Sequence, residues 1–232
     1  MTKMLLIICI GAGLMSCSSH LVLHQTPLIP LSKEAVFVSE TEEVIKPYRD
    51  SMATVMNKHV ANSPCNFVLE RPSSNLMNWV ADALFVNQTK TVRLSQPAFC
   101  LLNFGGLRAT LNKGEILMGD LYKLMPFDNT ITWVEIPVGL LPEIAAYLLK
   151  TGGEPLSNAY IENGKIVVNG LNENHSHVWI ITSDYLANGG DNMLFFKKGS
   201  SYSSLSTTLR DALIEEATYQ ENLLEIIDKR IR

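Results

Sequence analysis

The chain has 232 residues and a formal net charge of −4, with 19 lysines and arginines against 23 aspartates and glutamates. Hydrophobic residues make up 47% of it, which is enough for a sizeable core in a single domain. The basic residues are scattered and form no stripe, so the composition excludes a protein that binds the backbone of a nucleic acid.

The first 16 residues have the features of an export signal. Lys3 supplies a positive start, residues 4–10 are apolar but too few to cross a bilayer as a mature helix, and Leu14-Met15-Ser16-Cys17 ends like a bacterial lipoprotein signal. We therefore expect cleavage before Cys17, which would leave it as a diacylated or triacylated first residue, and two or three acyl chains would hold the exported protein on a membrane. Ser18 lacks the aspartate that favours inner-membrane retention, so the outer membrane is the expected address.

Residues 17–32 are expected to form a tether, because they contain Pro27 and Pro30 and show no helical or strand period. The remaining residues, 33–232, are then one domain. With Cys9 removed and Cys17 acylated, Cys65 and Cys100 would remain in an oxidising compartment. A disulfide between them and two free thiols are equally compatible with the sequence.

Apolar spacing, caps and turn residues predict the elements that follow in chain order. The N-terminal half is expected to contain a short strand or extended arm at 35–38, a helix from Thr41 to His59 with Pro47 as a kink or a late start, a strand at 66–70, a helix capped by Ser73 or Ser74, a strand at 99–102 and a short helix at 117–124. The C-terminal half is expected to contain a strand at 131–135, a helix at 140–148 stopped by Gly152, a hairpin around Asn163-Gly164, strands at 177–182 and 195–196, a helix at about 204–227, and a second helix or a strand ending at Arg232. This order predicts an α/β to α+β fold with a mixed sheet flanked by helices.

The stretch from Asn103 to Asn129 has the composition of a ligand site. The apolar run that precedes it predicts a buried strand ending at Asn103, and Gly105-Gly106 would allow a positive φ or a close approach to a ligand. Arg108 follows with a planar fork of donors, which suits a carboxylate, a phosphate or the edge of a base.

Several motifs resemble one known family, the C-terminal domain of bacterial and animal 5'-nucleotidases and UDP-sugar hydrolases, here in a stand-alone lipoprotein form. The resemblance covers about residues 64–200. It is carried by Ser74-Asn75-Leu76-Met77-Asn78-Trp79-Val80-Ala81-Asp82-Ala83, Asn103-Phe104-Gly105-Gly106-Leu107-Arg108, Gly114-Glu115-Ile116, Pro126-Phe127-Asp128-Asn129 and Tyr185-Leu186-Ala187-Asn188-Gly189-Gly190-Asp191.

The resemblance implies a substrate-binding role for residues in these motifs. Two aromatic rings, here Phe127 and Tyr185, would hold a nucleoside base between them, while Asp191 would contact the ribose hydroxyls. Asn103 and Arg108 would face the base or the phosphate. The full set that the resemblance implies is Arg71, Asn103, Gly105, Gly106, Arg108, Phe127, Asn129, Tyr185 and Asp191. The chain departs from the family pattern at Tyr185, where phenylalanine is commoner, at Asn192, which replaces a glycine, and near Arg71, where serine replaces an acidic residue.

Phosphoester hydrolysis in that family uses two metal ions held by Asp, His and Asn residues of a separate N-terminal domain. Its D-x-H and G-N-H-[DE] motifs are not found in this sequence, and Asn174-His175-Ser176-His177 has only Glu173 as a nearby carboxylate. We therefore expect no catalytic residue, no metal and no cofactor in this chain. The divalent metal pair is expected in a partner catalytic domain.

The expected function is that of a nucleotide- or nucleoside-recognition subunit in nucleotide catabolism, inactive alone and working with a metallophosphoesterase made as a separate polypeptide. It would be lipid-anchored at the outer membrane, on the periplasmic or the surface side. Two other functions stay open: a surface lipoprotein that binds nucleosides or nucleotides without hydrolysis, and a structural partner with a decayed pocket. An assay of 5'-nucleotide hydrolysis with and without a partner would separate them.

Overall fold

The computed structural model describes residues 39–90, 92 and 94–231. The expected signal, the acylation site Cys17, the tether and the strand at 35–38 lie outside the described residues. The described residues belong to two units, one that ends at Val44 and a compact one of residues 45–231, which contains the β-sheets described below. None of the helices in the described part of the chain is long and apolar enough to cross a membrane.

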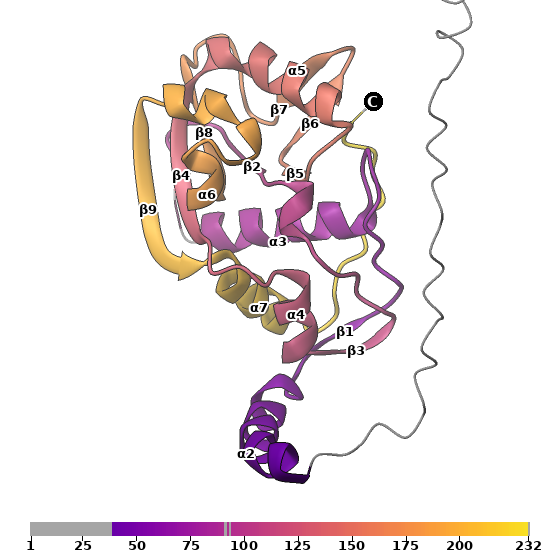
Figure 1. Cartoon of the computed structure of the whole chain (residues 1–232). Coiled ribbons are helices and arrows are strands. Elements are labelled where there is room, and N and C mark those ends of the chain that lie inside the picture. The colour runs from indigo at the N-terminus through magenta and orange to yellow at the C-terminus, as the bar shows by residue number, and fades with distance from the viewer. Residues whose placement is uncertain (1–38, 91, 93, 232) are drawn as a thin grey trace, which may run out of the picture. The chain divides into compact units, whose positions relative to one another are not determined.

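A five-stranded sheet lies at the centre of the larger unit, with the strand order β5-β2-β8-β4-β9 (Figure 1). β2 and β8 run parallel and the other neighbours run antiparallel, so the sheet is mixed, as predicted. Two smaller sheets pair β1 with β3 and β6 with β7. The strands are β1 (His59–Ser63), β2 (Ala98–Leu101), β3 (Gly114–Leu117), β4 (Thr130–Pro137), β5 (Leu156–Ser157), β6 (Ala159–Glu162), β7 (Lys165–Val168), β8 (His177–Ser183) and β9 (Ser201–Thr208).

Each face of the main sheet is buried in its own apolar core. Val134 and Ile136 of β4 pack in the core that includes α5 (Leu141–Thr151), whereas Ile131 belongs to the core with α3 (Asn75–Thr89) and α7 (Leu209–Gln220). Figure 1 shows α5 on one side of the sheet and α3 and α7 on the other. This placement leaves the loops at the ends of β2, β4 and β8 to form the surface discussed below.

Local signals correctly predicted most of the helices and the hairpin. Ser74 caps α3 by accepting a hydrogen bond from the backbone N–H of Met77 at 3.3 Å. Gly152 ends α5 in the left-handed region, with φ 80°. Asn163 and Gly164 both take positive φ in the turn between β6 and β7. The remaining helices are α2 (Ser39–Met56), which contains Pro47, α4 (Met118–Leu124) and α6 (Asp184–Ala187), with short 3-10 turns η1 (Phe104–Gly106), η2 (Val138–Leu140), η3 (Gly190–Asn192) and η4 (Leu194–Lys198).

The expected strand at 66–70 is wrong. Phe67 makes only an isolated bridge with Leu111, because the backbone N–H of Val68 bonds instead to the side chain of Asn75 at 2.8 Å. The strand in this part of the chain is β1, and His59 begins it instead of ending the preceding helix.

Three expectations near the C-terminus are also wrong. Phe195 and Phe196 lie in the 3-10 turn η4, which lets both rings enter the same core, whereas a strand would point them to opposite faces. Residues 204–208 belong to β9, and the C-terminal helix starts only at Leu209. Residues 221–231 form neither the second helix nor the strand that was expected there.

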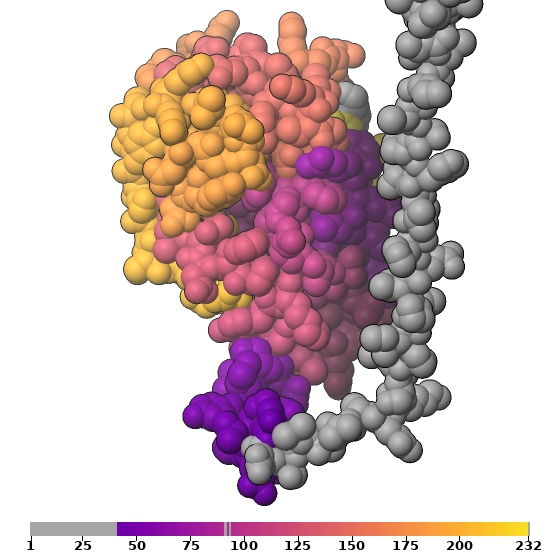
Figure 2. Space-filling model, in the orientation of Figure 1, coloured from indigo at the N-terminus to yellow at the C-terminus, as the bar shows by residue number. Residues whose placement is uncertain are grey.

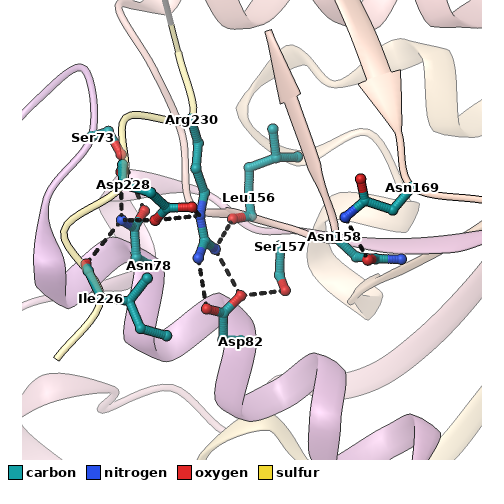
Figure 3. Close-up of polar contacts among 10 residues, drawn as sticks. All are labelled: Ser73, Asn78, Asp82, Leu156, Ser157, Asn158, Asn169, Ile226, Asp228 and Arg230. Atoms are coloured by element: carbon teal, nitrogen blue, oxygen red, sulfur yellow. Dashed lines mark hydrogen bonds and ion pairs between the residues drawn. The ribbon is translucent and has the colours of Figure 1, made fainter. Parts of the chain in front are cut away.

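Polar contacts instead hold residues 226–230 against α3 (Figure 3). The side-chain amide of Asn78 donates to the carbonyls of Ile226 at 3.1 Å and of Asp228 at 2.9 Å. Arg230 donates to both carboxylate oxygens of Asp82, at 2.7 and 2.6 Å, and to the carbonyl of Leu156 at 2.5 Å. Two residues of the α3 motif therefore attach the C-terminal segment to the domain.

Candidate functional site

Three separate loops come together around one cavity of about 380 Å³. The first follows β2, the second lies between α4 and β4, and the third follows β8. In Figure 2 the orange surface around residues 185–198 meets the magenta to rose surface around residues 103–128. The cavity is lined by Asn103, Gly105, Gly106, Arg108, Phe127, Asn129, Tyr185 and Asp191. These are the residues expected from the sequence, with the exception of Arg71.

The loop after β2 forms the 3-10 turn η1. Neither Gly105 nor Gly106 has a positive φ. A Cβ atom at Gly105 would make only ordinary van der Waals contacts, so lack of space explains the glycine only at Gly106. A Cβ atom at Gly106 would lie only 2.7 Å from the side-chain oxygen of Asn103. The absence of that atom lets the Asn103 side chain fold over the turn toward the third loop.

Asp191 joins the first and third loops through its carboxylate. Its Oδ2 accepts from the side-chain amide of Asn103 at 2.6 Å, and its Oδ1 accepts from the hydroxyl of Tyr185 at 2.8 Å. Its backbone carbonyl accepts from the hydroxyl of Tyr147 at 2.9 Å. Burial, followed by the nearby charge of Glu154, raises the pKa of Tyr147 to about 12, so this hydroxyl keeps its proton and remains a donor at neutral pH.

The two aromatic residues of the cavity are partly open to solvent. Phe127 is 44% exposed and Tyr185 is 46% exposed, so part of each ring is accessible to a ligand in the cavity. Tyr185 is fixed from behind, because a Cβ atom at Gly190 would overlap its ring. Its hydroxyl bond to Asp191 fixes the far end of the ring, so one ring face is left for the cavity.

Arg71 does not line the cavity. Its Nη2 pairs with Glu154 Oε1 at 2.9 Å, and its guanidinium lies 4.5 Å from the centre of the Phe104 ring. The other oxygen of Glu154 accepts from the backbone N–H of Phe104 at 2.5 Å. Arg71 and Glu154 thus support the η1 turn from outside.

Glu154 and Tyr147 were not found by sequence reasoning. Glu154 is 4% exposed, and its burial raises the pKa of the carboxyl above the usual range, although the Phe104 N–H and Arg71 act in the opposite direction. A single acidic residue after Gly152-Gly153 and a tyrosine within an amphipathic helix carry no motif. Only the fold brings them next to the loops.

No group of three or more His, Cys, Asp or Glu side chains in the described ranges is placed to hold a metal ion. The two histidines of the Asn174–His177 segment bond locally: His175 Nδ1 accepts from the N–H of Asn172 at 3.2 Å, and His177 Nδ1 lies 2.9 Å from Ser176 Oγ. Cys65 and Cys100 are free thiols, which decides between the two alternatives left by the sequence.

Comparison with known proteins agrees with this fold. Residues 52–137 match the family model described as 5'-nucleotidase, C-terminal domain. The chain is similar to a 5'-nucleotidase precursor from Thermus thermophilus, with a TM-score of 0.66 and 19% identity over 84% of this chain and 43% of that one. Two Bacillus subtilis proteins also match: Endonuclease YhcR, with 50% identity over 46 residues, and Trifunctional nucleotide phosphoesterase protein YfkN, with 24% identity over 109 residues.

The fold is a mixed sheet between two helical layers, with one cavity formed by three loops. The chain contains a C-terminal domain of the 5'-nucleotidase family. The matches cover 20% and 45% of this chain but only 4% and 7% of the two Bacillus subtilis relatives, and the chain spans less than half of the Thermus structure.

Proposed function

We propose that the cavity binds the nucleoside part of a nucleotide, with the base between Phe127 and Tyr185 and the ribose hydroxyls on Asp191. The observation that carries this proposal is that eight residues from three distant motifs line a single cavity. A flat base gains from contact with aromatic rings, whereas an ionised carboxylate accepts hydrogen bonds from hydroxyls. Each oxygen of Asp191 already accepts one bond and retains a second lone pair for the ligand.

Arg108 and the amides complete the proposed recognition. The Nη1 atom of Arg108 lies 3.5 Å from the carbonyl oxygen of Gly105. This is a long contact, so most of the guanidinium donors remain available to a phosphate or to the edge of a base. Asn103 and Asn129 would supply polar contacts at the edge of the base. The cavity volume of about 380 Å³ is within the range of sites for small organic ligands.

The proposed role in catalysis is that of a recognition subunit in nucleotide catabolism. Hydrolysis of the phosphoester would be supplied by a metallophosphoesterase on a separate polypeptide, whose metal pair would generate the attacking hydroxide. Support for a role beside such an enzyme comes from the match of residues 52–137 to the family model described as 5'-nucleotidase, C-terminal domain.

Titration calorimetry with adenosine and with AMP tests the recognition role. We expect saturable binding of both ligands to the purified chain and no hydrolysis of AMP by the chain alone. Adding a metallophosphoesterase partner and Mn²⁺ is expected to give turnover that depends on this chain. Binding of neither adenosine nor uridine, nor of their monophosphates, would contradict the proposal and favour a purely structural partner.

We further propose that the protein is exported and held at the outer membrane by acylation of Cys17. The basis is the lipobox-like Leu14-Met15-Ser16-Cys17 sequence. Mass spectrometry of the membrane fraction should find a mature chain that starts at a lipid-modified Cys17, and Cys17→Ser should leave the protein without lipid. An intact N-terminus with an unmodified Cys17 would show that the proposal is wrong.

A further inference from the structure

The loop that carries Phe127 is held by few backbone hydrogen bonds. Its ends are fixed, since the N–H of Met125 donates to Leu121 O at 3.0 Å and the N–H of Leu209 donates to Asn129 O at 2.9 Å. Between these points, the side chain of Arg210 donates hydrogen bonds to the carbonyls of Met125 and Phe127. Within the described residues, no other group donates to these two carbonyls. One residue of α7 thus supports the middle of the loop.

Arg210 combines three kinds of contact at this position. Its Nη1 donates to Met125 O at 3.3 Å and to Phe127 O at 3.4 Å, and its Nη2 pairs with the carboxylate of Asp128. Its guanidinium lies over Tyr122 of α4, 4.2 Å from the ring centre. Arg210 is only 8% exposed, so its contacts with the two carbonyls and the Tyr122 ring are shielded from water, whereas the Asp128 side chain is 82% exposed.

We propose that Arg210 is a positioning residue, which sets the place of the Phe127 ring at the cavity without touching the ligand. The inference rests on the proposed function, because it assigns Phe127 to the base. Arg210 is not among the residues that line the cavity, and its contacts reach the loop from the α7 side. Its effect on binding must therefore pass through the loop, and principally through Phe127.

The contacts require an arginine. A planar fork can reach two carbonyls and a carboxylate at once while stacking on a ring, whereas the single ammonium of lysine cannot. A side chain that binds a ligand needs neighbouring residues to hold it in position, so loss of those neighbours weakens binding even when the side chain itself is unchanged. Arg210→Lys is therefore expected to weaken binding nearly as much as Arg210→Met.

A double-mutant cycle tests this role with adenosine as the probe, measured by calorimetry on the full chain. We expect Arg210→Met to weaken binding by a factor no larger than that of Phe127→Ala. The double variant should bind like Phe127→Ala alone, because removal of the ring removes the route by which Arg210 acts. If the double variant instead weakens binding by the product of the two single-variant factors, Arg210 acts independently of Phe127 and the proposal is overturned.

Two further variants keep the test decisive if Arg210→Met does not fold. Asp128→Asn weakens the same anchor from a side chain that is 82% exposed, and it should also weaken adenosine binding. Lys90→Met is the matched control, since Lys90 likewise pairs with a carboxylate, Glu215 at 3.2 Å, and lies over an aromatic ring, Tyr219 at 5.5 Å. Lys90, Glu215 and Tyr219 do not line the cavity, so Lys90→Met should leave adenosine binding unchanged.

The two proposals fail in different ways. If Phe127→Ala leaves adenosine affinity unchanged, the assigned role of the cavity is wrong and the positioning role falls with it. If Phe127→Ala weakens binding but Arg210→Met and Asp128→Asn do not, only the positioning role is overturned.

Discussion

Replacing Phe127 or Tyr185 by alanine is expected to lower the affinity for adenosine by about one to two decades, because stacking of a base on an aromatic ring contributes roughly 1 to 3 kcal/mol. Both rings belong to the cavity and both are about half exposed, so their loss should cost little folding free energy. Titration calorimetry with adenosine and AMP measures the change.

Tyr202 on β9 provides the matched control for Tyr185. It is a tyrosine of nearly the same exposure, 47% against 46%, and it is not among the residues that line the cavity. Tyr202→Ala should leave the affinity nearly unchanged. Equal losses at Tyr185 and Tyr202 would mean that the effect is a general loss of structure, and an unchanged affinity in both cavity variants would refute base stacking.

Breaking the pair between Asp82 and Arg230 is expected to have the largest effect on stability. Arg230→Met leaves the Asp82 carboxylate without its two charge-assisted bonds, and removal of one partner of a buried pair costs about 3 to 5 kcal/mol. The side chain of Arg230 is only 9% exposed and that of Asp82 is 22% exposed, so water can replace few of the hydrogen bonds that the Asp82 carboxylate would lose. Urea unfolding followed by circular dichroism gives the change in the free energy of unfolding.

Lys46→Met is the control for this experiment. Its pair with Asp50 has a similar N–O distance, 2.7 Å, but the two side chains are 65% and 62% exposed. Exposed pairs contribute about 0 to 1 kcal/mol, so the control should unfold almost like the unchanged protein. A loss at Arg230 no larger than that at Lys46 would show that the C-terminal segment does not stabilise the domain.

The sequence predicts those elements whose signals are local. Asn163-Gly164 defines a turn between β6 and β7, and Gly152 ends α5, whatever the rest of the chain does. β9 is different, because Ser201–Thr208 has no clear apolar period and becomes a strand through its pairing with β4. Its neighbours along the chain therefore suggested a longer helix.

The same distinction applies to the cavity. Its eight lining residues stand in short motifs, so the sequence predicts them together, although it also predicts Arg71, which the fold turns toward Glu154. Arg210 and Tyr147 lie within helices and belong to no motif. Their contacts with the loops depend on how α7 and α5 pack, which no local pattern records.

The attachment of residues 226–230 to α3 has a consequence for folding kinetics. The contact between Asp82 and Arg230 joins positions 148 residues apart, so forming it early would require closure of a very long loop. We therefore expect this contact to form only after the sheet between its ends is in place. Weakening this contact should therefore speed unfolding and leave the folding rate almost unchanged. The C-terminal segment would then contribute to kinetic stability by slowing the unfolding of the native domain.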